Sequence, residues 1–229
     1  MLKLPEKIIY NNAANIVSIL GVLPLCILFI EGGHQYLIPL IIYNNIMDDL
    51  DGILAVKMNI KSDFGARLDN LCDGISHCII VMAVGMNYGV ICAAAGLITV
   101  AAIMIRVVSR LAPSAVTGVG SPTNELIRHI LFVLLLAPLF GLNAVPLLIA
   151  VFTIHAVSMI VPYKMPYLIR SITKSATAVG LVNVALVMAW LVPFATPVIA
   201  ACFILTHLYS FTAGGIKWLK TTKTPLTVL

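Results

Sequence analysis

Apolar runs long enough to cross a lipid bilayer recur along the whole of this 229-residue chain. A transmembrane helix needs roughly 17–25 predominantly apolar residues, and a helix satisfies its own backbone hydrogen bonds inside the hydrocarbon. The sequence therefore predicts an all-α integral membrane protein, a polytopic helix bundle of about eight transmembrane helices, with six or seven as the alternative count. The predicted spans are centred on residues 13–30, 35–56, 67–86, 90–109, 125–141, 144–162, 176–194 and 196–215.

The composition excludes an ordinary soluble domain. Apolar residues make up 61% of the chain and charged residues 10%, whereas about 25% of the residues of soluble proteins are charged. No linker rich in Pro, Gly or Ser separates the apolar runs. We therefore expect a single membrane-embedded domain over residues 1–229, in which residues 1–12 form a short amphipathic segment at the membrane interface.

The net charge is +5, and the positions of Lys and Arg along the chain indicate membrane topology and not nucleic-acid binding. Lys and Arg occur only at alternate connections between the predicted spans, and the connections near residues 31–34, 87–89, 141–143 and 194–196 have none. By the positive-inside rule the basic side is cytoplasmic. The pattern predicts two cytoplasmic termini and a cytoplasmic active site, in what we expect to be a bacterial inner membrane. The basic residues are Lys3, Lys7, Lys57, Lys61, Arg67, Arg106, Arg110, Arg128, Lys164, Arg170, Lys174, Lys217, Lys220 and Lys223.

All six aspartates of the chain lie between residues 48 and 73, in otherwise apolar surroundings. Asp48 and Asp51 are three residues apart and Asp69 and Asp73 are four apart, so each pair shares one face of a helix. A turn near residues 57–66 would bring the four carboxylates together, where they would repel one another. One or two divalent cations would remove that repulsion, and oxygen ligands favour Mg²⁺ or Mn²⁺.

Small residues accompany these aspartates and indicate a bulky ligand. Gly52, Ala55 and Gly65 leave room for close approach to the helix backbone. Magnesium held by carboxylates commonly completes its coordination with the oxygens of a phosphorylated substrate. Metal, phosphate and membrane together predict phosphoryl or phosphatidyl transfer.

The aspartate segment resembles the CDP-alcohol phosphotransferase family, whose motif is D-x2-D-G-x2-A-R-x8-G-x3-D-x3-D. The family arginine is Val56 in this chain. The segment "FGARLDNLCDGIS" is also similar to the phosphatidylserine synthase branch, and "NNAANIVSILG", with Asn12 and Asn15, looks like the opening of the family's first span. The matched positions are Asp48, Asp51, Gly52, Ala55, Gly65, Asp69 and Asp73.

The resemblance implies an enzyme of phospholipid biosynthesis with a six-helix family core plus two further helices, usually a homodimer. It would transfer the phosphatidyl group of a CDP-linked lipid such as CDP-diacylglycerol to the hydroxyl of a small polar acceptor and release CMP. Serine is the first expectation for the acceptor, with glycerol phosphate, inositol phosphate or another alcohol as alternatives. A cation-coupled transporter is the alternative of another class.

The resemblance also implies roles for individual residues. Two divalent ions, Mg²⁺ or Mn²⁺, would bind the four motif aspartates, and Asp73 would double as the general base. The nucleotide would contact Asp48, Asp51, Gly52, Ala55, Gly65 and Asp69. Basic residues that could compensate for the missing arginine, or contact phosphate or the acceptor, are Lys57, Lys61, Arg67, Arg106 and Arg110.

Other polar residues near the motif are expected to have supporting roles. Asp49 matches no family position and is interpreted as a helix contact or an outer partner of the site. Asp63 is expected to be a cap or a surface charge. His77 could share a face with Asp73 as an alternative base. Asn124 could shape the acceptor pocket or cap the following helix.

The remaining residues that could bind metal are expected to be structural. The five cysteines lack CxxC or Cys/His ligand spacing, which argues against a zinc site and favours reduced packing residues. His155 and His207 are expected to be packing or hydrogen-bonding residues.

Overall fold

The computed structural model describes residues 4–112, 114, 117–166 and 176–222. In these residues it is all-helical, which confirms the predicted fold class. Each predicted span coincides with a helical stretch. These are Ala13–Val22 (α2) continued by Leu23–Phe29 (η1), Leu37–Lys57 (α3), Asp63–Asn87 (α4), Val90–Leu111 (α5), Thr123–Leu139 (α6), Ala144–Ile160 (α7), Ala176–Leu191 (α9) and Thr196–Thr222 (α10).

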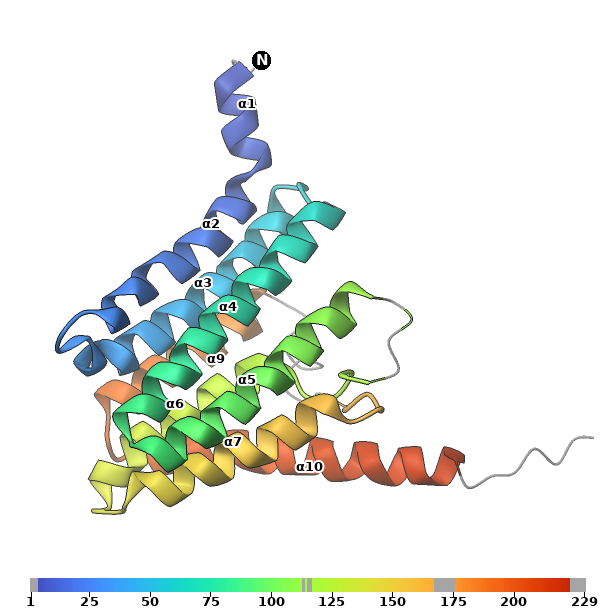
Figure 1. Ribbon diagram of the computed structural model, residues 1–229. Helices are drawn as coiled ribbons and strands as arrows, with labels where there is room; N and C mark the ends of the chain where they lie inside the picture. Colours follow the sequence, from blue (N-terminus) through green and yellow to red (C-terminus); the bar gives the residue numbers. More distant parts are fainter. Residues whose placement is uncertain (1–3, 113, 115–116, 167–175, 223–229) are drawn as a thin grey trace, which may run out of the picture.

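Two shorter helices complete the described structure. Gly33–Tyr36 (η2) leads into α3, and Leu4–Asn11 (α1) extends away from the bundle at the N-terminus (Figure 1). Ile8 and Ile9 of α1 are exposed, and the Tyr10 hydroxyl donates to the Met58 carbonyl at 3.3 Å. This exposure agrees with the interfacial position expected for residues 1–12, which stays a prediction.

Three helices are long and apolar enough to cross a membrane by length and composition, namely α4, α5 and α10. The stretches 13–29, 144–160 and 176–191 are apolar but shorter. Hydrophobic side chains exposed on the bundle surface include Ile98 (67%) and Leu181 (65%). Such exposure is expected where lipid and not water surrounds the helices. The structure thus agrees with an integral membrane helix bundle.

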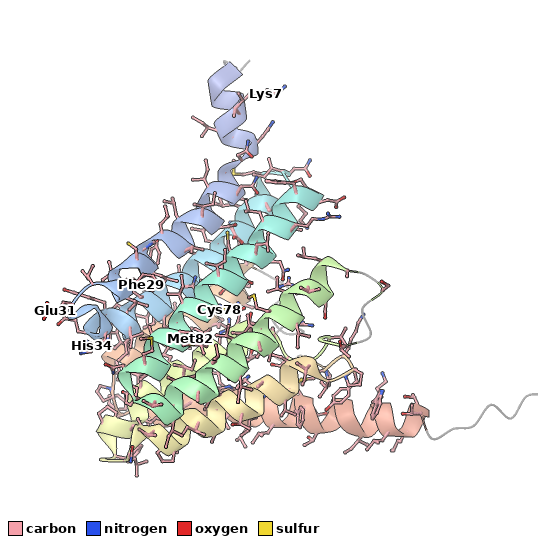
Figure 2. The ribbon with its side chains drawn as sticks, viewed as in Figure 1. Lys7, Phe29, Glu31, His34, Cys78 and Met82 are labelled. Atoms are coloured by element: carbon pink, nitrogen blue, oxygen red, sulfur yellow. The ribbon has the colours of Figure 1, made fainter. Side chains whose placement is uncertain are left out.

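The helices run back and forth between two ends that differ in charge. In Figure 1 the connections after α4, α6 and α9 lie at the lower left, whereas the α3–α4 connection and the carboxyl end of α5 lie towards the upper right. Figure 2 places Glu31 and His34 at the left end, far from Lys7 of α1. The connections at the left end contain no Lys or Arg, so the charge asymmetry predicted from the sequence follows the two ends of the bundle.

The turn between α3 and α4 has a clear local cause. Asn59 has a left-handed backbone (φ 54°), and the Ile60 and Asn59 amides donate to the carbonyls of Ala55 (3.1 Å) and Val56 (3.2 Å). This is the pattern of a Schellman ending. Ser62 then caps α4 by accepting from the Gly65 amide at 3.0 Å, so the cap is Ser62, while Asp63 is the exposed acid of the first turn.

The packing of the helices places α2, α3, α4 and α6 around one polar region. α4 packs against α2 and α5, and α3 packs against α2 and α9. α5 packs against α7, and α10 against α6 and α9. The buried core is aliphatic and aromatic, with Leu25, Ile80, Ile103, Phe132 and Phe152 among its most enclosed side chains.

Candidate active site

The Schellman turn brings the predicted carboxylates together. Asp48 and Asp51 come from α3 and Asp69 from α4, and their carboxylate oxygens lie within 4.8 Å of one another. Asp51 is buried, and the other two are partly exposed. Three carboxylates at this spacing suit a hard divalent cation, because such ions prefer oxygen ligands. The donor set therefore fits the ions that the sequence predicts.

Asp73 lies one turn beyond Asp69 on α4 and is buried. Its carboxyl group lies beside that of Asp48, and one of its oxygens is 3.9 Å from an Arg110 guanidinium nitrogen. Asp73 thus borders the carboxylate group on one side and a cation on the other. Asp73 is not one of the three aspartates whose carboxylate oxygens lie within 4.8 Å of one another.

Two side chains from other helices hold the carboxylates in place. The Ser18 hydroxyl of α2 donates to Asp51, and the Asn124 side-chain amide of α6 donates to Asp48. Asn124 therefore faces the site and is not the cap of α6, since the residue before that helix is Pro122. Of the two roles predicted for Asn124, the contact with the site agrees with the structure.

A partly buried polar network joins α3, α6 and α9. Asn183 of α9 donates to the Asp49 carboxylate at 2.7 Å and accepts from Asn45 at 2.7 Å. Asn45 in turn accepts from Arg128 Nε at 2.9 Å, and Arg128 pairs with Glu125 at 3.2 Å. Asp49 therefore makes a helix contact, as its position outside the family motif predicted.

The small residues of the motif differ in their surroundings. A Cβ added to Gly52 would meet nothing within 4 Å, so the backbone there is open to a ligand. A Cβ added to Gly65 would lie 3.0 Å from Asn15 Oδ1, so Gly65 allows α2 to approach α4 closely. Ala55 is partly exposed, and Val56 is 58% exposed. The open backbone at Gly52 leaves room for the predicted nucleotide.

The candidate basic residues fall into two groups. Lys57, Lys61 and Arg67 are exposed around the α3–α4 turn. Arg106 donates to the Gly118 carbonyl, whereas Arg110, with 40% of its side chain exposed, faces Asp73. The structure therefore brings Arg110 next to Asp73.

His77 is buried on α4, four residues beyond Asp73. Its Nδ1 has no hydrogen-bond partner among the described residues. It is not among the side chains that group with the three close carboxylates. His77 therefore stays an alternative base.

Sequence reasoning did not identify Ser18, Asn45 or Asn183. Each is a polar residue inside a predicted apolar span. Asn183 stands in the stretch "GLVNVALVMAW", where an amide needs a partner. An isolated polar residue of this kind signals a buried hydrogen bond but does not identify the partner helix, because that depends on packing.

Comparisons with known proteins agree with the aspartate motif and the helical fold. The chain is 28% identical over 88 residues to an uncharacterized protein of Aquifex aeolicus (strain VF5). That match covers 34% of this chain and 42% of the Aquifex protein. A sequence model of the CDP-alcohol phosphatidyltransferase family matches residues 10–222, which include every described helix from α2 to α10. The chain belongs to the CDP-alcohol phosphatidyltransferase family.

Proposed function

We propose that this enzyme transfers the phosphatidyl group of CDP-diacylglycerol to the hydroxyl of serine and releases CMP. The observation that carries the proposal is the group formed by Asp48, Asp51 and Asp69, with Asp73 beside it. Family membership supports transfer from a CDP-alcohol and does not support the alternative of a cation-coupled transporter. The homodimer and the cytoplasmic orientation of the site belong to the same proposal.

The carboxylates would hold two divalent cations, Mg²⁺ or Mn²⁺. When bound, such ions neutralise the diphosphate and the charge that develops on the leaving CMP. Ser18 and Asn124 orient the Asp51 and Asp48 carboxylates through hydrogen bonds, as outer partners of metal ligands generally do. The open backbone at Gly52 gives the nucleotide room beside these carboxylates.

Asp73 would act as the general base. The hydroxyl oxygen of the acceptor attacks the β-phosphorus of the CDP-lipid, and its proton passes to the Asp73 carboxylate. The bond from this phosphorus to the bridging oxygen breaks, and CMP leaves with that oxygen. The direct attack forms no covalent intermediate with the protein. Arg110, 3.9 Å from Asp73, is placed to hold an anionic group of the acceptor.

The arginines favour serine over a phosphorylated acceptor. Arg128 is buried and bonded to Asn45 and Glu125, and Arg106 donates to a backbone carbonyl. Among the described residues, Arg110 is an exposed arginine that lies next to Asp73. Its guanidinium suits the carboxylate of serine.

The experiment is a panel of acceptors offered to the purified enzyme with labelled CDP-diacylglycerol and Mg²⁺ or Mn²⁺. Serine should give a labelled phospholipid and an equal amount of CMP, and excess chelator should abolish both until the metal is restored. A labelled product from glycerol phosphate or inositol phosphate, and none from serine, would identify the alternative acceptor. Full turnover in excess chelator would contradict the metal proposal.

A further inference from the structure

Three of the five histidines of the chain meet inside the bundle, away from the aspartate motif. His129 of α6, His155 of α7 and His207 of α10 are buried, and each offers a ring nitrogen within 4.8 Å of the others. The ring centroids are 4.4–5.2 Å apart. We call these three residues the histidine cluster. They are 26 and 52 residues apart along the chain, so no local spacing motif marks them.

The cluster leaves several ring nitrogens unsatisfied. His129 Nδ1 and His155 Nε2 are 2.7 Å apart and share one proton in a hydrogen bond. His129 Nε2, His155 Nδ1 and His207 Nε2 are buried and have no hydrogen-bond partner among the described residues. Leaving a buried polar group without a partner is unfavourable for folding. Hydrophobic packing alone therefore does not account for three imidazoles in one enclosed place.

Metal binding would replace the proton shared by His129 and His155 and would give the third imidazole of the cluster a partner. Zn²⁺ is held by imidazole nitrogens at about 2.0–2.1 Å, so two nitrogens on one tetrahedral ion lie roughly 3.3 Å apart. The His129–His155 pair at 2.7 Å would have to open by about 0.6 Å, with the metal in place of the shared proton, and the His207 nitrogen, within 4.8 Å of the other two, would complete the set.

The donor set selects a different class of ion from the aspartate motif. Neutral imidazoles favour Zn²⁺ and related transition metals, whereas carboxylates favour Mg²⁺ and Mn²⁺. We propose that His129, His155 and His207 form a second metal site, which binds one Zn²⁺ ion, with a water or small anion as the fourth ligand. The proposal does not depend on the identity of the acceptor or on the role of Asp73.

The location of the histidine cluster gives this site a structural role. An ion there would tie α6, α7 and α10 together, and His129 follows Asn124 by five residues, or about 7.5 Å along α6. Asn124 is the side chain that holds Asp48. A zinc ion would therefore stabilise the helix that supports the catalytic carboxylates, without contacting the substrate.

The test is metal binding by the full-length, detergent-solubilised protein, purified through an affinity tag that contains no histidine. After treatment with a chelator, the protein is titrated with Co²⁺ in excess Mg²⁺, which occupies the carboxylates. We expect the visible absorption of tetrahedral Co²⁺ with nitrogen ligands, saturating at one ion per chain and lost on addition of Zn²⁺. Added Zn²⁺ should also raise the unfolding temperature, because it binds the folded state.

Variants assign the signal to the cluster. His155→Gln and His207→Gln should lose the saturable absorption and the thermal shift. His34→Gln, which alters an exposed histidine outside the cluster, and Asp51→Asn, which alters the carboxylate site, should retain both. Retention of the signal by His155→Gln and His207→Gln would overturn the proposal. If those variants do not fold, the Co²⁺ titration of the unaltered protein still tests the metal site. Absence of a saturable Co²⁺ band in that protein would refute the site and favour a purely hydrogen-bonded cluster.

Discussion

The side-chain amide of Asn124 donates to the carboxylate of Asp48, so a helix 76 residues further along the chain holds the first aspartate of the motif. Because Asp48 belongs to the group proposed to hold metal, Asn124 acts on the reaction through that carboxylate. Removing an outer partner of a metal ligand typically costs 10–100-fold in affinity or activity.

Asn124→Ala should therefore lower kcat/KM by about 10–100-fold and raise the Mg²⁺ concentration needed for half-maximal rate. The measurement is a Mg²⁺ titration of CMP release. Asn143→Ala is the matched control, since Asn143 caps α7 by accepting from the Val145 amide. It belongs to the α6–α7 connection, which lies at the other end of the bundle from the α3–α4 turn (Figure 1). A normal Mg²⁺ dependence in Asn124→Ala would show that the hydrogen bond to Asp48 does not matter for activity.

Ser18 makes the corresponding contact from α2, with Asp51 as acceptor. Ser18→Ala leaves a buried carboxylate with one donor fewer, so the free energy of unfolding should fall by about 1–3 kcal/mol, with weaker metal binding. Thr153→Ala is a suitable control, because the Thr153 hydroxyl bonds only to a carbonyl of its own helix among the described contacts. Thermal unfolding with and without Mg²⁺ distinguishes the two variants, and equal shifts would contradict the assigned role of Ser18.

Neighbouring aspartates 48 and 49 should respond differently to the same change. Asp48 is in the close carboxylate group, whereas Asp49 accepts from Asn183. Asp48→Asn should abolish metal-dependent transfer. Asp49→Asn should keep most of the activity and the Mg²⁺ dependence, because an amide oxygen can still accept from Asn183. The free energy of unfolding should fall, since a neutral acceptor forms a weaker hydrogen bond than a carboxylate. Loss of Mg²⁺-dependent activity in Asp49→Asn would mean that Asp49 is itself a ligand.

The sequence predicts contacts between residues that are close along the chain better than contacts between distant helices. The helices follow from apolar runs. The approach of Asp48 and Asp51 to Asp69 follows from helical spacing and one tight turn, within 22 residues. The partners of these aspartates, Ser18 and Asn124, come from distant helices whose packing no local pattern specifies.

The histidines show the same limit more sharply. The sequence predicts that His155 packs or forms a hydrogen bond, and it does bond to His129. The sequence argument against a zinc site, however, rests on ligand spacing along the chain, which detects only sites built from neighbouring residues. A site made by three helices leaves no such spacing. The three histidines come together only through the packing of α6, α7 and α10.

Val56 replaces the family arginine at the end of α3 and is 58% exposed. An arginine at this exposed position can extend into solvent, so Val56→Arg should leave stability within about 0.5 kcal/mol and leave CDP-lipid binding unchanged or tighter. If Lys57 or Lys61 compensates for the missing arginine, alanine at that lysine should weaken binding, while Lys217→Ala on α10 should not. Dispensable lysines together with an inactive Val56→Arg would show that the pocket differs from that of the family.

Asp73 offers the sharpest test of the proposed chemistry, because ligation and base catalysis predict different losses. Asp73→Asn keeps the shape and one oxygen of the side chain but cannot take the acceptor proton, and a positioned base contributes about 10²–10⁴-fold. CDP and Mg²⁺ binding, measured by calorimetry, should persist while the rate of transfer falls by roughly two or more orders of magnitude. Parallel loss of binding and transfer would make Asp73 mainly a ligand. Transfer near the normal rate would move the base elsewhere, and His77, four residues along the same helix, would be tested next.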